Sequence, residues 1–239
     1  MKPALYLKDS YMKEFSSTVE SVKDDKFVVL METAFYPNMG GQPYDTGKLL
    51  RESDGSEFPV VYVGKFDNMI SHEVLRPGLK PGDKVKGVID WDRRYKLMRM
   101  HTAAHVLARV LYNETGANTS GNQLGIEQSR IDFTLEGFDK DRIISCIKKA
   151  NEIIKKGLDV RIEETSYEKA IGDDDFSAPS KHLMPKLERL RVINIKGLDK
   201  QACGGTHLKD LSEIGAIIFI KAENKGKSNR RIYFSLQDP

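Results

Sequence analysis

Two short motifs that lie far apart in the chain constrain its fold more than any other feature. The first, HTAAH, carries His101 and His105, and the second, CGGTH, carries Cys203 and His207. The chain has only two cysteines and five histidines, so these motifs hold a large share of its soft ligands. Imidazole nitrogen and thiolate sulfur are donors that zinc prefers. The sequence therefore predicts a fold that brings these four side chains to one zinc ion per chain.

The local sequence supports this geometry in both motifs. Residues 93–111 contain no Gly or Pro and are rich in Leu, Met, Ala and Arg, which favours a helix with both histidines on one face. In the second motif, Gly204 and Gly205 favour a tight turn. Taken singly, the first motif also fits a pair of packed core histidines, and the second fits a structural cysteine beside a surface histidine. Only their combination favours the metal.

The front of the chain reads as a small β domain. Strands are expected at residues 4–7, 17–22, 27–31, 47–50, 58–63 and 85–90, separated by turn residues. Short strands without a convincing helix predict a small β-barrel or sandwich over residues 1–90. Within it, residues 35–47 read FYPNMGGQPYDTG, and the Gly40-Gly41-Gln42-Pro43 loop either lets the backbone approach a partner closely or simply connects a hairpin.

From Trp91 onward helices and strands alternate, so residues 91–239 are expected to form a second domain. Asp92 is expected to cap the long helix and Gly116 to end it. A polar loop is expected at 117–125 and an acidic loop at 172–180. A helix is expected from Asp139 or Asp141 to Gly157, a short helix at 167–171, and strands at 129–135, 159–164, 189–195, 215–222 and 230–236. Cys146 should lie on the apolar side of its helix, in the core. The pattern predicts an α+β class: a small N-terminal β-barrel followed by a two-layer α+β domain with a largely antiparallel sheet.

Composition limits the classes of protein to consider. A chain of 239 residues with 39% hydrophobic and 31% charged residues is typical of a globular protein. No apolar run approaches the length of a membrane span, and residues 1–10 lack the apolar core of a signal peptide. Two cysteines do not make a disulfide framework, so a reducing cytoplasm is the expected compartment.

Basic residues gather in two places, although the net charge of +3 decides nothing by itself about nucleic acid. Such clusters either hold phosphates or form a solvated face. The first cluster comprises Arg93, Arg94, Lys96 and Arg99, and the second comprises Lys221, Lys225, Lys227, Arg230 and Arg231.

The residues around the expected metal exclude two common zinc enzymes. A metalloprotease of the HExxH type needs a glutamate where this chain has Thr102. The zinc deaminase signature is also missing, because the chain has neither His-x-Glu nor CxxC. A Cys-His nucleophile is conceivable, but a cysteine near three histidines is more economically a ligand. The zinc would either staple the fold with four donors or act in catalysis, and spacing does not choose between these roles.

Three separated motifs, HTAAH, ACGGTH and EIGAIIF, follow one another in the order found in the editing domain of alanyl-tRNA synthetase. The chain also has a β-rich N-terminal part with the motif NMGGQPYDTG and lacks a synthetase catalytic core. These two features favour a freestanding editing protein over a synthetase. The chain resembles the freestanding AlaX family, in its medium-length class with an N-terminal barrel. The resemblance spans nearly the whole chain.

The resemblance implies hydrolysis, in trans, of tRNA(Ala) mischarged with serine, with glycine as a second substrate, while correctly charged Ala-tRNA(Ala) is spared. The family's zinc ligands carry over to the two motifs already named. Thr119, or alternatively Ser120, matches the residue that reads the serine hydroxyl, and Asp132 matches an acidic position near the pocket. The glycine loop resembles the motif thought to set how the barrel meets the editing domain. Neither DNA nor a membrane is an expected partner.

Two other readings remain open from the sequence. A non-catalytic, zinc-stapled tRNA-binding module would bind tRNA and leave the ester intact. A zinc hydrolase of small esters or amides would turn over its substrate whatever the identity of the tRNA.

Overall fold

The structure is a computed structural model that describes residues 4–135, 137, 139–173, 176 and 188–239. The chain divides into two compact units, Met1–Leu97 and Met98–Pro239. The division lies inside the helix α1 (Trp91–Thr115), which begins just after the predicted domain boundary. Each unit is described by itself below.

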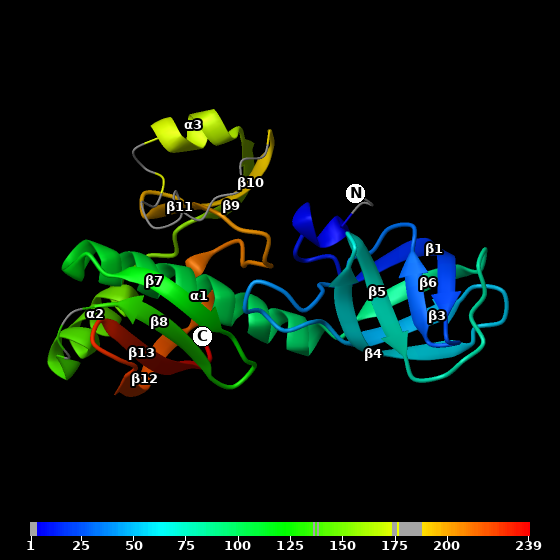
Figure 1. Cartoon of the computed structure of the whole chain (residues 1–239), viewed down its shortest axis with the longest axis horizontal. Helices are drawn as coiled ribbons and strands as arrows, with labels where there is room; N and C mark the ends of the chain where they lie inside the picture. The colour runs from blue at the N-terminus through cyan, green and yellow to red at the C-terminus, as the bar shows by residue number, and fades with distance from the viewer. Residues whose placement is uncertain (1–3, 136, 138, 174–175, 177–187) are drawn as a thin grey trace. The chain divides into compact units, whose positions relative to one another are not determined.

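Among residues 4–97, which the structure describes, six strands close into an antiparallel barrel in the order β1-β2-β5-β4-β3-β6 (Figure 1). Their bounds are β1 (Glu14–Lys23), β2 (Phe27–Leu30), β3 (Gly47–Arg51), β4 (Glu57–Phe66), β5 (Met69–Val74) and β6 (Lys84–Ile89). Their inward side chains, such as Val28, Leu49 and Val63, have no exposed surface. The predicted barrel is confirmed.

Two details of that prediction are wrong. Residues 4–7 do not form a strand, because Leu7 N and Lys8 N donate to the carbonyl oxygens three residues earlier and make a 3-10 turn, η1 (Leu5–Leu7). The strand β5 was not expected, since polar residues interrupt its apolar pattern. One of them, His72, is nevertheless fully buried, where its ring contacts Thr33 Oγ1 and the carbonyl oxygen of Val28, each at 2.9 Å.

A buried ion pair fixes the glycine-containing loop within the first unit. The guanidinium of Arg94 donates to the carboxylate of Asp45 and to the carbonyl oxygens of Ser10 and Ala34. Asp45 also accepts from Tyr36 N at 2.6 Å, and neither charged side chain is exposed. Arg94 is therefore part of the core of this unit and is exposed neither to phosphates nor to solvent, so neither alternative for its cluster holds at this residue.

The helix α1 begins and ends through local contacts. Asp90 precedes its first turn and accepts from Arg93 N at 3.2 Å, so Asp90 rather than the predicted Asp92 supplies the cap. The predicted end at Gly116 is confirmed: this residue has φ +73° and its N–H donates to Tyr112 O at 2.8 Å. The helix is thus one turn longer at its C-terminus than the apolar pattern alone suggests.

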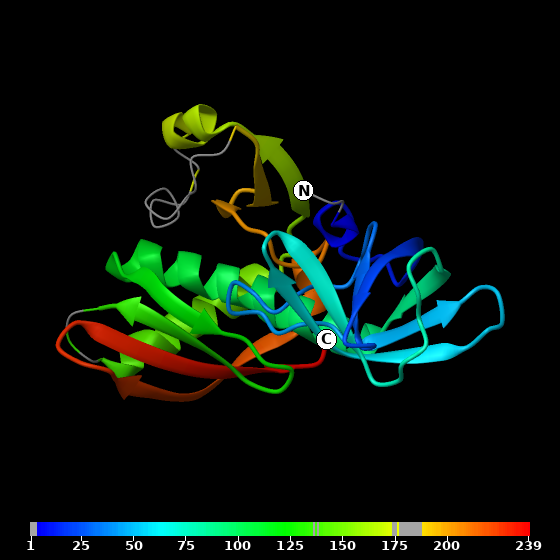
Figure 2. The same ribbon diagram turned by 45° about the vertical axis from the view of Figure 1, so that its right-hand side comes forward.

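The described part of the second unit contains two antiparallel sheets. The four-stranded sheet runs in the order β12-β13-β8-β7, and the three-stranded sheet in the order β11-β10-β9. The bounds are β7 (Asn118–Gln123), β8 (Ser129–Thr134), β9 (Val160–Thr165), β10 (Leu190–Ile195), β11 (Asp199–Ala202), β12 (Ala216–Asn224) and β13 (Asn229–Gln237). Helices α1 and α2 (Lys140–Ile154) lie along the four-stranded sheet (Figures 1 and 2). The α+β architecture with antiparallel pairing is confirmed.

Helix α2 is positioned by its cap and by one amide. The side chain of Asp139 caps it by accepting from Arg142 N at 3.1 Å. Asn151 exchanges two hydrogen bonds, each of 2.8 Å, with the backbone of Ile217 on β12. Cys146 is buried on this helix, as predicted. The short elements α3 (Tyr167–Gly172) and η2 (Leu211–Ile214) complete the unit.

One polar segment was expected to be a loop and is a strand: residues 118–123, within the predicted loop 117–125, form the edge strand β7. A second edge strand, β11 at residues 199–202, was not predicted. An edge strand is held by backbone hydrogen bonds on one side only and has solvent beside it, so it does not need an apolar pattern. The predicted acidic loop 172–180 falls mostly outside the described residues. No helix in the described part of the chain is both long and apolar enough to cross a membrane.

Candidate metal centre

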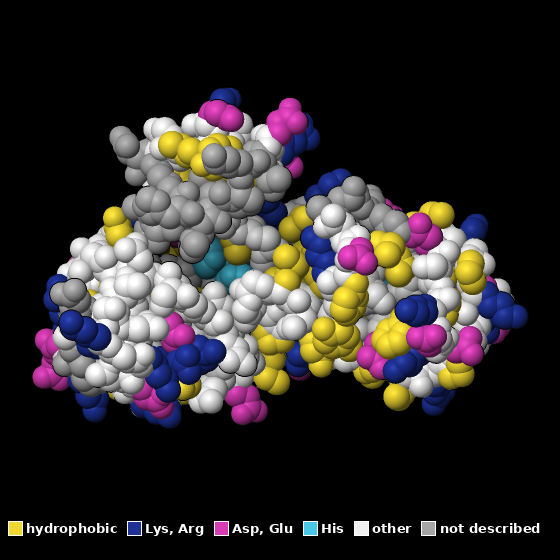
Figure 3. Space-filling view, in the orientation of Figure 1, with side chains coloured by type: hydrophobic (Ala, Val, Ile, Leu, Met, Phe, Trp, Pro, Cys, Tyr) yellow, Lys and Arg dark blue, Asp and Glu magenta, His cyan; other side chains and the backbone are white. Residues whose placement is uncertain are grey.

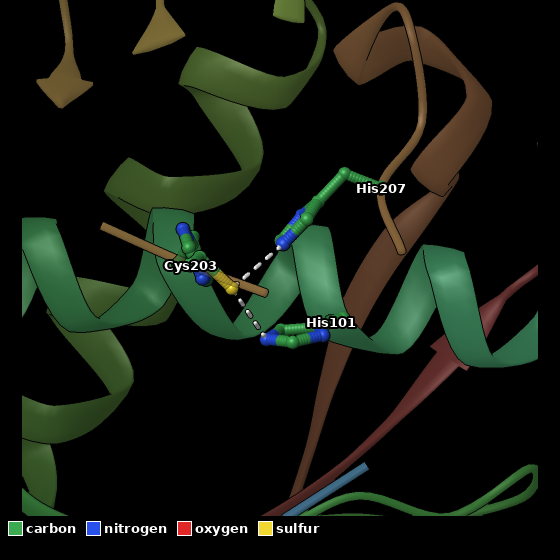
Figure 4. A group of neighbouring side chains, drawn as sticks. His101, Cys203 and His207 are labelled. Atoms are coloured by element: carbon green, nitrogen blue, oxygen red, sulfur yellow. Dashed lines mark hydrogen bonds between the residues drawn. The ribbon is translucent and has the colours of Figure 1, made fainter. Parts of the chain in front are cut away.

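The second unit brings the two motifs of the sequence together. His101 and His105 lie on α1, and Cys203 and His207 lie on the segment that follows β11. One donor atom from each of the four side chains lies within 4.8 Å of the others. Figure 4 shows the sulfur of Cys203 directed toward the rings of His101 and His207. The fold thus makes a single group of four donors from residues that the sequence separates widely.

The distances within the group suit one small ion. Cys203 Sγ lies 3.3 Å from His207 Nε2 and 3.6 Å from His101 Nε2. The ring centroid of His207 lies 4.3 Å from that of His101 and 4.5 Å from that of His105. Three nitrogen donors and one sulfur donor around one point are a set that zinc accepts, so the group could hold a metal ion.

Two polar side chains hold the histidine rings from outside the group. Gln201 Nε2 lies 2.6 Å from His105 Nδ1, and Thr102 Oγ1 lies 3.2 Å from His207 Nδ1. In each case the contact engages Nδ1, and in His207 the other ring nitrogen, Nε2, lies 3.3 Å from Cys203 Sγ. Such outer contacts orient a ligating imidazole and set its tautomer.

The segment that carries Cys203 is held against the strand β10. Cys203 N donates to Arg191 O at 3.2 Å, and the Arg191 guanidinium donates to Cys203 O. Gly205 N donates to the sulfur of Cys203 at 3.3 Å. The two glycines form a bend at Gly205 rather than the predicted tight turn, and the segment is anchored at Cys203, where these contacts hold the thiol.

Burial controls the protonation of the donors. Desolvation, together with the nearby positive charge of Arg191, lowers the pKa of His101 to about 3. Desolvation and the neighbouring histidines hold the pKa of His105 and His207 well below the ordinary value. The imidazoles are therefore neutral at physiological pH, which is the state that binds a metal. Burial raises the pKa of the Cys203 thiol, and a bound metal ion would displace that proton.

A second layer behind His105 was not found from the sequence. Gln201 Nε2 also contacts Asp199 Oδ2 at 2.8 Å, and Arg109 Nε lies 4.0 Å from the other carboxylate oxygen. Burial raises the pKa of Asp199 to about 6, against the opposing effect of Arg109. Alternation along β11 places residues 199 and 201 on one face of the strand, and that period is the signal in the sequence that could have indicated them.

The other predicted site residues lie on the four-stranded sheet. Thr119 is half-buried on β7, and Asp132 is nearly buried on the neighbouring strand β8. Both carboxylate oxygens of Asp132 accept from Arg231, at 2.7 and 2.9 Å, and Arg130 adds a bond of 2.9 Å. Arg231 in particular lowers the pKa of Asp132, so this carboxylate stays ionised. The hydroxyl of Ser120 donates to Asn229 Oδ1 at 3.0 Å.

The predicted basic clusters are largely internal to the fold. Arg99 is buried and donates to the carbonyl oxygens of Ile214 and Gln237, each at 2.8 Å. Arg230 is also buried and donates to oxygens of the turn that precedes it. Lys221 forms an ion pair with Glu223 at 2.6 Å. Neither alternative considered for the basic clusters, phosphate binding or a solvated face, therefore holds for Arg99 and Arg230, as neither does for Arg94.

The centre can be reached from solvent on one side. Figure 3 shows histidine side chains at the surface of the molecule. The exposed fractions of the three histidines of the group are 3–7%, so only a small part of each side chain contacts solvent.

Comparison with known proteins identifies the family. Residues 190–233 match the threonyl and alanyl tRNA synthetase second additional domain, and residues 5–93 match the class II (A) tRNA synthetases. The alanyl-tRNA editing protein AlaX-M of Methanosarcina barkeri is 53% identical over the full length of both chains. AlaX-M of Saccharolobus solfataricus is 41% identical over 99% of this chain and its own full length. The alanine–tRNA ligase of Pyrococcus furiosus is 40% identical over 97% of this chain but only 25% of its own length. This chain therefore belongs to the AlaX-M family of alanyl-tRNA editing proteins.

Proposed function

We propose that this chain hydrolyses, in trans, the aminoacyl ester of tRNA(Ala) mischarged with serine, and that glycine is a second amino acid it removes. Correctly charged Ala-tRNA(Ala) is spared. The observation that carries the proposal is the convergence of four metal donors from two distant motifs in a chain that matches freestanding editing proteins over its full length. The partner is tRNA(Ala), the compartment is the cytoplasm, and residues 91–239 are the editing domain that follows the barrel of residues 1–90.

One zinc ion per chain is the proposed cofactor. His101, His105, Cys203 and His207 would hold it, since the three neutral imidazoles and one thiol are the donor set zinc prefers and their donor atoms lie within 4.8 Å of one another. When bound, zinc supplies a positive charge that polarises or orients a water beside the ester.

The reaction itself asks little covalent chemistry of the protein. Water adds to the ester carbonyl carbon, the bond from that carbon to the ribose oxygen breaks, and the second proton of the water passes to the ribose oxygen. Free serine and uncharged tRNA leave. Because the ester is already activated, most of the rate would come from positioning the carbonyl and from stabilising the developing oxyanion. The desolvation of the groups around Cys203 would strengthen such electrostatic contacts.

Discrimination between serine and alanine rests on one hydroxyl. We assign its recognition to Thr119, half-buried on β7, whose own hydroxyl would lose its partner when alanine occupies the pocket. A polar group left unpaired in a buried site disfavours the substrate that lacks the matching hydroxyl. Asp132 is assigned a supporting position nearby, since its carboxylate is held between Arg231 and Arg130. Removal of glycine would need a further contact besides the one to the hydroxyl.

The test is deacylation of Ser-, Gly- and Ala-tRNA(Ala) by purified protein. Cys203→Ala and a metal-stripped sample serve as the inactive controls, and restored zinc should restore activity in the second. We expect rapid loss of serine, sparing of alanine, and no turnover in either control. Thr119→Val should lower the rate on serine much more than the rate on glycine. Equal loss of alanine and serine would contradict the proposed selectivity.

A zinc-stapled tRNA-binding module is a second candidate, because four protein donors are the number found in closed structural zinc sites. That module would bind tRNA(Ala) and leave the serine ester intact in the same assay. A hydrolase of small esters would instead act on a minimal seryl ester as fast as on the charged tRNA.

A further inference from the structure

Thr102 stands between the two histidines of the first motif, and the proposed reaction gives it no role. It follows His101 on α1, and no part of it is exposed. A threonine inside a helix has only moderate helix propensity, so a buried one requires contacts that hold its hydroxyl.

The hydroxyl of Thr102 meets three polar atoms. Its oxygen lies 2.9 Å from Met98 O, one turn earlier in α1. It accepts from the backbone N–H of Leu208 at 3.2 Å, and it lies 3.2 Å from His207 Nδ1. Two of these three partners come from the second motif and its next residue, so this one oxygen joins the helix to the segment that carries His207.

The three contacts decide which partner donates. A hydroxyl has one hydrogen and two lone pairs. The shortest contact, to the carbonyl oxygen of Met98, can only be made by the hydroxyl hydrogen, since both atoms are oxygens. The contact with His207 must then be donated by the ring, so Nδ1 carries the hydrogen and Nε2 carries a lone pair. That Nε2 lies 3.3 Å from Cys203 Sγ, on the side of the four donors (Figure 4).

We propose that Thr102 is a positioning residue of the metal centre: its hydroxyl fixes the Nδ1–H tautomer of His207 and so presents Nε2 to the metal. The role rests on the metal centre of the proposed function. The opposite tautomer would place a hydrogen on Nε2, between the ring and the metal, and would require the hydroxyl to turn away from Met98 O. Thr102 acts before the metal arrives, because it selects the binding form of the ring in the metal-free protein.

The test compares three variants. Thr102→Val removes the hydroxyl and keeps the shape of the side chain, whereas Thr102→Ser keeps the hydroxyl. Thr115→Val is the matched control, because Thr115 lies on the same helix, donates to the carbonyl oxygen four residues earlier at 2.6 Å and accepts from Ala117 N at 3.1 Å, with no histidine as partner.

The first measurement is the zinc dissociation constant of each purified full-length protein, by competition with a chromophoric chelator. Loss of an outer-shell partner typically weakens metal binding about 10–100-fold. We expect a loss of affinity of this size for Thr102→Val. For Thr102→Ser and Thr115→Val the dissociation constant should change by less than about threefold, which is below the range for loss of an outer-shell partner. Equal affinity of Thr102→Val and wild type would overturn the role of Thr102.

The second measurement needs no metal and no substitution at Thr102. Long-range 1H–15N correlation spectra of the metal-free wild-type protein distinguish the two tautomers of each imidazole, and a His207→Asn sample assigns the signals of that ring. The expected result is an Nδ1–H tautomer for His207. An Nε2–H tautomer would sink the proposal even if Thr102→Val failed to fold. A wild-type protein that binds no zinc would overturn the metal centre itself, and that failure would already be visible before any variant is made.

Discussion

The buried pair of Arg94 and Asp45 in the first unit allows a quantitative prediction. Asp45→Asn keeps the size of the side chain and removes its charge, while Arg94 stays in place with no exposed surface. Breaking a buried ion pair from one side costs about 3–5 kcal/mol, since the other charge remains buried and uncompensated. Asparagine keeps one acceptor oxygen, and Arg94 keeps its bonds to two backbone carbonyls. We therefore expect the lower end of that range, about 3 kcal/mol.

The assay is urea unfolding followed by tryptophan fluorescence. Trp91 is the only tryptophan of the chain and lies in the first unit, where its ring meets Tyr11 at 5.7 Å and the ammonium of Lys13 at 4.5 Å. Its signal therefore reports the unfolding of the unit that contains the pair. With a urea dependence of about 2 kcal/mol per molar, the midpoint should fall by about 1.5 M.

The control and the coupling complete the test. Lys48 and Glu57 form an exposed pair on the same barrel, at 2.7 Å, and Glu57→Gln should cost less than about 1 kcal/mol. Arg94→Met combined with Asp45→Asn should cost much less than the sum of the two single changes, because no buried charge remains. An unchanged midpoint for Asp45→Asn, or additive costs in the double variant, would show that the pair does not stabilise the barrel.

Three further outcomes follow from the structure. Burial lowers the pKa of His72 to about 4, so as the pH falls the unfolded chain binds a proton at this residue before the folded chain does. The free energy of unfolding should therefore decrease as the pH falls from about 6.5 to about 4. In a plot of the urea midpoint against pH, His72→Gln should flatten that part of the curve. Gly215→Ala should lower the melting temperature strongly, because φ is +82° and the new Cβ would lie 2.0 Å from a backbone oxygen. Gly197→Ala, where φ is +72° and the space around the new Cβ is open, should cost only about 1 kcal/mol. Similar melting temperatures for the two variants would refute the steric argument. Gln201→Leu should weaken zinc binding about tenfold or more in chelator competition, because it removes the amide that contacts both His105 Nδ1 and Asp199 Oδ2; an unchanged affinity would contradict that role.

The sequence predicts the main helices and strands because the spacing of apolar residues and the residues that end an element are local properties of the chain. The helix of residues 93–111 and its end at Gly116 follow from helix-forming residues and one glycine with positive φ. The expected start at Asp92 was off, since the backbone decides which of two nearby aspartates precedes the first turn. Strands such as β7 and β11 are held by hydrogen bonds to a neighbouring strand, and their own residues do not indicate which strand that is.

The candidate site divides along the same line. The four donors were indicated by residue type and spacing, and the fold brings them together. The contacts of Gln201 and Thr102 with the rings depend on how α1 meets the segment after β11, which no local pattern encodes. The fate of Arg94 and Arg99 shows the converse. A run of basic residues on a helix resembles a phosphate-binding face until the carboxylates and carbonyl oxygens that surround it are known.

The two cysteine thiols differ in exposure, so their reactivity can be used to measure whether the centre holds a metal. Cys146 is sealed in the core of the second unit with 1% of its surface exposed, whereas Cys203 is partly accessible in the proposed centre. A thiol reagent applied to the native protein should therefore modify one sulfur per chain, and denaturation should reveal the second. A sulfur that binds a metal reacts slowly, so the rate of the first modification would report occupancy of the centre in the native protein.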